Sequence, residues 1–453
     1  MVQLARLAVG TVQPGADPQP LVWALLEAFR REGVLVQSYL SRADFPRYQG
    51  AMSITGLHAR HLDSWLMSPD MCRALLRRAA RLADLALVEG DFAPPSYEGQ
   101  AGGQLEPLCQ WLDLPRLAVL DTRRLTRCRL PELPPGIEGL LLDGTPPSAP
   151  FVRLAMDMES LLGVPVLGAL EAEDPLRAAL DRVPRGEGLP PQLSRALGDR
   201  LTQWWKPGEI LSLAGRRDLP RPQGPCPLGC TSPTRRPTVA IAYDEAFNGY
   251  FPDTLELLES LGASVVGFSP LRDEHLPPQA EIVYFGCGHP ERYAAALADN
   301  HCLVAALRSH WRAGRLVYGQ GGGAAYLCRQ MEASDGTFRR MAGIIPAVAR
   351  FVREPVRSTP AELTLSRPTW LADAGMRLRG YRNPNWRLEV ADQAACLSAQ
   401  GPDEVGLWGD FQTVGSLVHL NLVARPDLLG RFFLPRRRKP EAHEQLCVRS
   451  LST

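Results

Sequence analysis

The sequence has 453 residues and a mass of 49.8 kDa, a length that predicts two or three domains. Apolar residues make up 45% and charged residues 22%, proportions typical of a globular protein, which excludes a chain that is mainly disordered. Fifty basic side chains nearly cancel 49 acidic ones, and the net charge of +1 argues against a general nucleic-acid-binding protein.

No apolar run reaches the roughly 18 residues of a membrane span, and the N-terminus lacks a charged segment followed by a long apolar core. We therefore expect neither a transmembrane helix nor a signal peptide. The 10 cysteines are scattered, without the dense pattern of a small disulfide-rich secreted protein. These features predict a cytoplasmic protein with no membrane partner.

The first half of the chain alternates short apolar runs with helical patterns. The runs fall at 4–9, 34–39, 85–88, 117–120, 139–142 and 164–167, and the helical patterns at 21–31 and 69–82. Continuous apolar runs separated by helices are typical of parallel strands that are covered on both faces. The sequence therefore predicts a doubly wound, three-layer α/β domain over residues 1–215.

Residues 216–237 interrupt this alternation. They are rich in Pro, Gly and Arg and have little to bury, so we interpret them as an interdomain linker. Cys226 and Cys230 lie in this stretch. Because a structural zinc site needs four ligands and no second pair accompanies them, linker cysteines are the favoured interpretation, with metal binding as the open alternative.

The alternation restarts in the second half. Strands are predicted at 238–242, 265–268, 282–285, 316–318, 377–382 and 414–423, and helices at 252–261, 293–298, 302–313 and from 323 through 331. A glycine-rich stretch at 319–323 joins the strand at 316–318 to the following helix. The sequence thus predicts a second doubly wound, three-layer α/β domain over residues 238–453.

Several longer stretches carry a more specific pattern. In the second half they are AYDEAF from Ala242, GASVVGFSPLRDEHLP from Gly262, GCGHPE from Gly286 and LVYGQGGGAAYLC from Leu316, and in the first half RHLDSWLM from Arg60 and LALVEG from Leu85. Over nearly the whole length, the chain resembles the cobyrinic acid a,c-diamide synthase family. The resemblance implies a P-loop NTPase-like synthetase domain followed by a class I glutamine amidotransferase-like domain. It also implies ATP and Mg²⁺ as cofactors and a tetrapyrrole carboxylate as substrate.

The loop that would bind phosphate departs from this pattern. It keeps Gly10 and Gly15, but Ala16 or Asp17 stands where a phosphate-binding loop has its lysine, and Asp17 or Pro18 where it has Ser or Thr. An aspartate repels phosphate, and a proline removes a backbone N–H donor. The loop residues therefore argue against nucleotide binding.

Two further observations bear on the nucleotide site. The resemblance places Glu89, in LALVEG, near the metal and the phosphates, which makes it the candidate metal ligand. Downstream, the stretch DFAPPSYEGQAGG from Asp91 has two consecutive prolines where the family has a glycine-rich stretch that contains Asp. The sequence also has only two lysines, Lys206 and Lys439, so chemistry that needs a lysine has few candidates.

The nucleophile of the glutaminase is also missing. The family has a cysteine at the strand-to-helix turn, and here that position is Gly321, which cannot form a thioester. Cys328 lies two turns along the predicted helix and cannot replace it. The resemblance places the oxyanion-hole and turn region at Gly286, Cys287, Gly288 and Gly322. Cys287 is the alternative nucleophile, although it would have to attack from a different direction.

His419 stands where the family has the first of two histidines, and Asn421 replaces the second. His419 is a candidate residual base, with a structural histidine as the alternative. A second histidine-containing stretch of the family appears as GYRNPN from Gly380, without either histidine. Candidate substrate-binding residues are Asp63, Arg379 and Arg382, of which the two arginines could pair with substrate carboxylates. For Arg379, which shares a strand face with Arg377, the alternative is an ordinary exposed strand edge.

These observations support three hypotheses. The first is a catalytically impaired relative that binds a tetrapyrrole, or that forms a homodimer or a heteromer with an active synthase. The second is an ATP-dependent amide ligase that uses free ammonia instead of glutamine. The third is a different enzyme that uses Cys287 or His419. We expect no nucleic-acid partner, and we interpret the basic stretch PRRRKP at 435–440 as a solvated tail.

Overall fold

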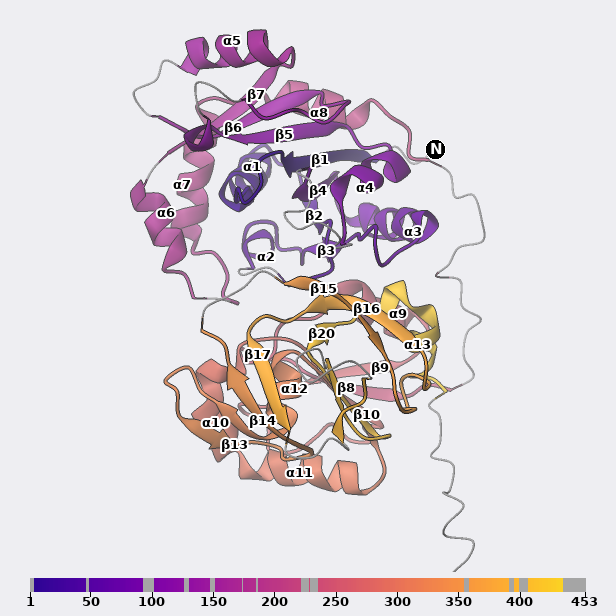
Figure 1. Cartoon of the computed structure of the whole chain (residues 1–453). Helices are drawn as coiled ribbons and strands as arrows, with labels where there is room; N and C mark the ends of the chain where they lie inside the picture. Colours follow the sequence, from indigo (N-terminus) through magenta and orange to yellow (C-terminus); the bar gives the residue numbers. More distant parts are fainter. Residues whose placement is uncertain are drawn as a thin grey trace, which may run out of the picture. The chain divides into compact units, whose positions relative to one another are not determined.

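Figure 1 shows the computed structural model of the chain. It describes residues 4–45, 49–92, 102–125, 130–146, 151–172, 174–184, 186–220, 228, 235–353, 358–390, 395–398 and 406–434. The chain divides into two units, Met1–Thr231 with Gly249–Leu257 and Ser232–Asn248 with Leu258–Thr453. Cys226, Cys230, most of the stretch after Asp91 and the basic stretch at 435–440 lie outside the described residues.

The first unit is built on a seven-stranded sheet in which every pair of neighbouring strands is parallel. Its order is β3-β2-β4-β1-β5-β6-β7. The strands are β1 Ala5–Thr11, β2 Val36–Leu40, β3 Arg60–His61, β4 Leu85–Asp91, β5 Arg116–Asp121, β6 Gly139–Thr145 and β7 Val166–Glu171. Since the apolar runs lie at the centre of this sheet, their side chains are buried on both faces.

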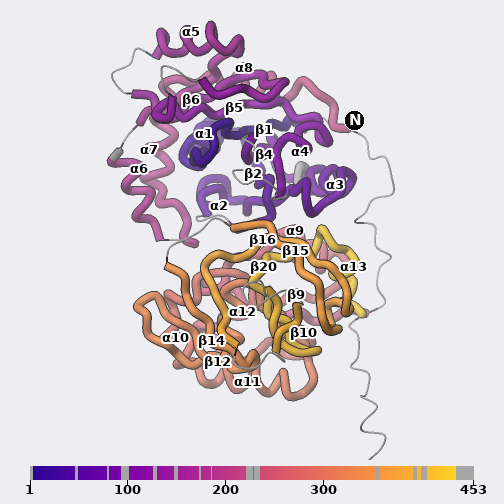
Figure 2. Tube along the Cα trace, in the orientation of Figure 1, coloured from indigo at the N-terminus to yellow at the C-terminus, as the bar shows by residue number. Residues whose placement is uncertain are grey.

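Helices cover both faces of this sheet. They are α1 Gln19–Arg31, α2 Gly50–Thr55, α3 Pro69–Ala79, α4 Leu105–Leu112, α5 Phe151–Leu162, α6 Asp174–Asp181, α7 Pro191–Thr202 and α8 Pro207–Gly215, with 3-10 turns η1 Ala80–Leu82 and η2 Thr122–Arg124. Figure 2 shows α1 and α7 together on one side of the sheet and α3 and α4 on the other. Leu7 and Val9 of β1 pack in the core with α1, α7 and α8, whereas Ala118 and Leu140 face a separate core beside α5.

The second unit has a six-stranded sheet of order β18-β19-β11-β10-β8-β9, which is parallel except for the pair β18 and β19. Its strands are β8 Thr238–Ala242, β9 Ser264–Phe268, β10 Ile282–Phe285, β11 Leu316–Gln320, β18 Leu407–Gly409 and β19 Thr413–Ser416. The helices of this unit are α10 Ala294–Asp299, α11 His301–Arg312, α12 Gly322–Leu327 and α13 Pro426–Gly430, with η3 Pro290–Tyr293 and η5 Leu422–Ala424. Helix α9 Pro252–Ser260 lies mostly in the segment Gly249–Leu257, which is grouped with the first unit. The predicted fold class, two α/β domains with parallel sheets, is confirmed.

Two smaller sheets complete this unit. One has the order β13-β12-β14-β17, with β12 Cys328–Glu332, β13 Phe338–Arg340, β14 Ile345–Phe351 and β17 Trp386–Val390. The other has the order β15-β16-β20, with β15 Thr359–Thr364, β16 Arg377–Arg382 and β20 Val418–His419. Among the described helices, none has both the length and the apolar character needed to span a bilayer.

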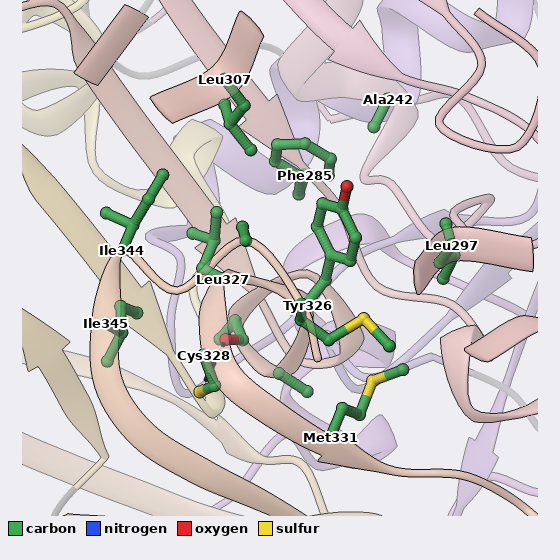
Figure 3. Packing of buried hydrophobic residues seen from close by; sticks show 14 of the residues in the cluster. Ala242, Phe285, Leu297, Leu307, Tyr326, Leu327, Cys328, Met331, Ile344 and Ile345 are labelled. Carbon is green, nitrogen blue, oxygen red and sulfur yellow. Dashed lines mark hydrogen bonds between the residues drawn. The ribbon is translucent and has the colours of Figure 1, made fainter. Parts of the chain in front are cut away.

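Two predicted elements end differently in the structure. The helix predicted through residue 331 stops at Leu327, because the chain from Cys328 onward pairs with β13 and β14 as strand β12. Figure 3 shows Cys328 among the apolar side chains of the core. The strand predicted at 414–423 is divided into β19 and β20, which belong to different sheets, and then turns into η5, where Asn421 caps the N–H of Val423.

Candidate functional site

The turn between β11 and α12 has the backbone of a nucleophile elbow. Gly321 connects the two elements with φ +56° and ψ −116°, a conformation that glycine adopts easily and other residues adopt only with strain. Backbone hydrogen bonds fix the turn, since the Gly321 N–H donates to Ser416 O at 2.8 Å and the Gly323 N–H donates to Gly286 O at 3.1 Å. The sharp strand-to-helix turn is therefore present without a nucleophilic side chain.

Other side chains occupy the space beside Gly321. A Cβ atom added there would lie 2.7 Å from Cys287 Sγ and 2.9 Å from Asn383 Nδ2, both closer than real Cβ contacts. Cys287 is only 4% exposed, and burial raises the pKa of its thiol far above the ordinary range. Because the thiolate is the reactive form, the structure favours a packing role for Cys287 over the alternative nucleophile.

Asn383 also determines how His419 is engaged. The N–H of Asn385 donates to Asn383 Oδ1 at 2.8 Å, which leaves the Asn383 amide nitrogen facing His419 Nε2 at 3.0 Å. Since an amide nitrogen donates, His419 Nε2 accepts, and the ring proton is assigned to Nδ1. His419 Nε2 is thus bound to the amide of Asn383, which itself lies beside Gly321. Sequence reasoning missed Asn383, although it stands within the GYRNPN stretch that lacks the histidines of the family.

Side chains from within the loop after β1 and from η2 hold that loop, which the sequence analysis compared with a phosphate-binding loop, in place. Gln13 bridges to the end of β5, because its Nε2 donates to Asp121 O at 3.1 Å and its Oε1 accepts from the Asp121 N–H at 2.6 Å. The Arg124 guanidinium donates to Pro14 O at 3.0 Å and to Gly15 O at 2.6 Å. A cation in this position contacts the loop carbonyls, whereas a phosphate would need its N–H groups.

The N-terminus of α1 offers few donors to an anion. Pro18 and Pro20 have no N–H, and the Gln19 N–H donates to Asp17 Oδ1 at 3.1 Å. The Asp17 carboxylate also places a negative charge where a phosphate would bind. The residues present therefore do not fit a nucleotide phosphate or its Mg²⁺.

Glu89 lies on β4, beside β1 and β2. Burial, followed by the nearby Asp17 carboxylate, raises its pKa from 4.5 to about 7. In the described part of the chain, no three His, Cys, Asp or Glu side chains gather as they would around a metal ion. Glu89 therefore stands beside another carboxylate, without a cation to balance the two charges.

We expect Glu89→Gln to stabilise the folded protein at about pH 8 by up to about 3 kcal/mol and to have little effect near pH 4.5. The raised pKa means that the folded state holds the proton more tightly than the unfolded chain, so ionisation penalises folding as the pH rises through 7. Urea unfolding of both proteins at the two pH values measures the difference. Asp17→Asn should give a smaller effect of the same sign, and a Glu89→Gln effect independent of pH would contradict the assignment.

Comparison with known proteins identifies the family. Residues 238–423 match the CobB/CobQ-like glutamine amidotransferase domain. The cobyrinate a,c-diamide synthase of Salmonella typhimurium is 27% identical over 94% of this chain and 96% of that protein, and that of Syntrophotalea carbinolica is 28% identical over 94% and 97%. These matches support membership of the chain in the cobyrinate a,c-diamide synthase family. The hydrogenobyrinate a,c-diamide synthase of Rhodobacter capsulatus is 29% identical over 83% of this chain and 88% of that protein.

Solved structures match parts of the chain at low similarity. A crystal structure of a glutamine amidotransferase covers 43% of this chain and 96% of its own length, at 18% identity and a TM-score of 0.34. The signal recognition particle receptor FtsY from Elizabethkingia anophelis covers 48% of this chain and 65% of its own length, at 13% identity and a TM-score of 0.27.

Asp63, the candidate substrate-binding residue in the first unit, is fully buried. Its Oδ2 accepts from the Ala43 N–H at 2.9 Å, and its Oδ1 accepts from the N–H groups of Trp65 at 2.9 Å and Leu66 at 3.1 Å. The carboxylate therefore holds the chain that follows β2 against the chain that follows β3.

The two candidate arginines of the synthase-like second unit lie on β16. Arg379 Nε donates to Glu362 Oε2 at 2.6 Å, and Arg377 Nη1 donates to the other oxygen at 3.2 Å, so one carboxylate on β15 bridges both. Arg377 and Arg379 are exposed, whereas Arg382, opposite Val418 of β20, is partly buried. The structure thus brings Arg377 and Arg379 together on one strand face, as their spacing predicts.

Proposed function

We propose that this protein is a non-catalytic member of the cobyrinate a,c-diamide synthase family that binds a tetrapyrrole carboxylate. The observation that carries the proposal is the elbow, where Gly321 supplies no nucleophile and Cys287 and Asn383 fill the adjacent space. A thioester with glutamine needs a thiolate at this turn. We infer that the second unit releases no ammonia from glutamine.

The first unit supports the same conclusion for ATP. The Arg124 guanidinium and the Gln13 amide hold the loop where phosphates would bind, and Asp17 adds a repelling charge. Phosphoryl transfer depends on positioned positive charge, and this loop has no lysine. Both chemical steps of the family therefore lack their machinery, while the two α/β scaffolds are retained.

A binding role accounts for the retained scaffold. The names of the relatives give a cobyrinate or a hydrogenobyrinate as the molecule they act on, and such macrocycles present several carboxylates. Arginine suits carboxylates because its planar guanidinium can form two parallel hydrogen bonds. We further propose that the protein acts as a homodimer or in a heteromer with an active synthase, to which it would deliver or from which it would receive the macrocycle.

The proposal predicts macrocycle binding without turnover. Titration with cobyrinic acid, followed by visible absorption, should saturate, and calorimetry with Mg-ATP should show no binding. Incubation with glutamine, or with ammonia and Mg-ATP, should yield neither glutamate nor an amide. The Salmonella typhimurium cobyrinate a,c-diamide synthase is the positive control for each assay. ATP binding with ammonia-dependent amide formation would replace this proposal with the ligase, and absence of macrocycle binding would leave only a role through protein partners.

A further inference from the structure

One face of the sheet β13-β12-β14-β17 has an excess of positive charge among the described residues. The sheet β13-β12-β14-β17 packs one face on the core of the second unit through Met331, Ala349 and Leu388. Since side chains alternate along a strand, the neighbouring positions face outward. We call this outward surface the arginine face, and it consists of Phe338, Arg340, Arg350, Arg387 and the adjoining Arg353.

Strand register places these residues next to one another. Arg340 lies opposite Gln330, Phe338 lies opposite Glu332, and Arg350 lies opposite Arg387. Two arginine residues opposite each other on neighbouring strands repel, so this pair is costly unless an anion lies over it.

Only part of this positive charge is balanced within the chain. Arg350 pairs with Glu389 at 2.5 Å and Arg353 with Glu332 at 3.0 Å. Within the described ranges, neither Arg340 nor Arg387 makes an ion pair, and both side chains are exposed. The face therefore has an excess of positive charge, although the chain as a whole is nearly neutral.

Phe338, the aromatic residue of the arginine face, already contacts an arginine side chain. The Arg350 guanidinium carbon lies 5.1 Å from the centroid of the Phe338 ring, a cation–π contact that holds the guanidinium against the sheet. Single-stranded nucleic acid is typically bound by rings that are free to stack on bases, and Phe338 is covered on this side.

We propose that the arginine face binds an acidic surface of a protein partner. Carboxylates can form paired hydrogen bonds with Arg340 and Arg387, and such charge complementarity steers association. An outward strand face suits a macromolecular surface, whereas small ligands are typically bound in concave sites. The inference goes beyond the proposed function and does not depend on whether the chain binds a macrocycle or retains catalysis.

The test compares two pairs of charge reversals in the full-length protein. Arg340→Glu with Arg387→Glu alters the face, whereas Arg153→Glu with Arg312→Glu changes the net charge equally at exposed positions on α5 and α11. The probe is fluorescein-labelled poly-L-glutamate, followed by anisotropy at about 0.1 M salt, where charges beyond about 10 Å are screened. We expect the first pair to weaken binding by about tenfold or more and the control pair by less than about threefold.

Two results would overturn the proposal. An equal loss in both pairs would mean that the net charge of the chain, and not this face, binds the probe. Tighter binding of single-stranded RNA than of poly-L-glutamate, lost in the first pair alone, would assign the face to nucleic acid. Because all four substitutions are at the surface, far-UV circular dichroism and urea unfolding should match wild type, which keeps the comparison valid.

Discussion

Gly321→Cys is expected to destabilise the second unit by about 3 kcal/mol and to produce no glutaminase activity. Two costs combine, since φ of +56° is unfavourable for a residue with a Cβ atom, and that atom would lie 2.7 Å from Cys287 Sγ. A thiol forced into this position would also meet a His419 whose Nε2 already accepts a bond from Asn383. Urea unfolding and release of glutamate from glutamine measure the two effects.

Two matched variants separate these costs. Gly321→Ala introduces the Cβ atom without the thiol, and it should account for most of the loss. Adding Cys287→Ala to Gly321→Cys removes the sulfur atom nearest to the new Cβ atom. The loss of stability in the double variant should therefore be about 1 kcal/mol smaller than the sum of the losses in the two single variants. If Gly321→Cys alone kept wild-type stability and hydrolysed glutamine, the elbow would be a site that lacks only its nucleophile, and the inference that Cys287 and Asn383 block it would be wrong.

The sequence was sufficient for features that are local. Apolar runs, helix stops and turn glycines predicted most of the parallel strands of both sheets, because each depends on a few neighbouring residues. The two-residue strand β3 was not predicted. The absence of a cysteine at Gly321 and of a lysine in the phosphate loop was also readable from the motifs. The helix predicted through residue 331 was wrong, because Cys328–Glu332 acquires strand partners at β13 and β14 that local pattern does not reveal.

The side-chain contacts at Gly321 and in the loop after β1 could not be predicted from the sequence. Gln13 and Asp121 are 108 residues apart, and Arg124 is 109 residues from the Gly15 carbonyl that it bonds. Asn383, directly after β16, and His419, on β20, are 36 residues apart. Each of these contacts depends on how the strands are ordered, so no spacing in the sequence signals it. The absence of a cysteine at Gly321 and of a lysine in the loop after β1 can thus be read from the sequence, whereas the contacts found at these two places depend on the fold.

Asp63→Ala is expected to lower the free energy of unfolding by about 4 kcal/mol, one of the largest effects of any single substitution in the first unit. It removes a buried carboxylate that accepts three backbone N–H bonds, and it leaves those donors buried without their acceptor. Asp70→Ala is the matched control, since that carboxylate is 32% exposed and pairs with Arg73, and its loss should cost about 1 kcal/mol or less. Urea unfolding followed by circular dichroism measures both.

A second substitution of Asp63 distinguishes a structural role from direct contact with the macrocycle. Asp63→Asn keeps the size and one acceptor oxygen, so it should fold with a smaller loss of stability and bind cobyrinic acid with unchanged affinity. A direct contact would give the opposite result, with wild-type stability and altered affinity. Because the three N–H groups come from the loops after two neighbouring strands, these bonds support a structural role for Asp63. Altered affinity at wild-type stability would return Asp63 to the substrate site that the family resemblance implies.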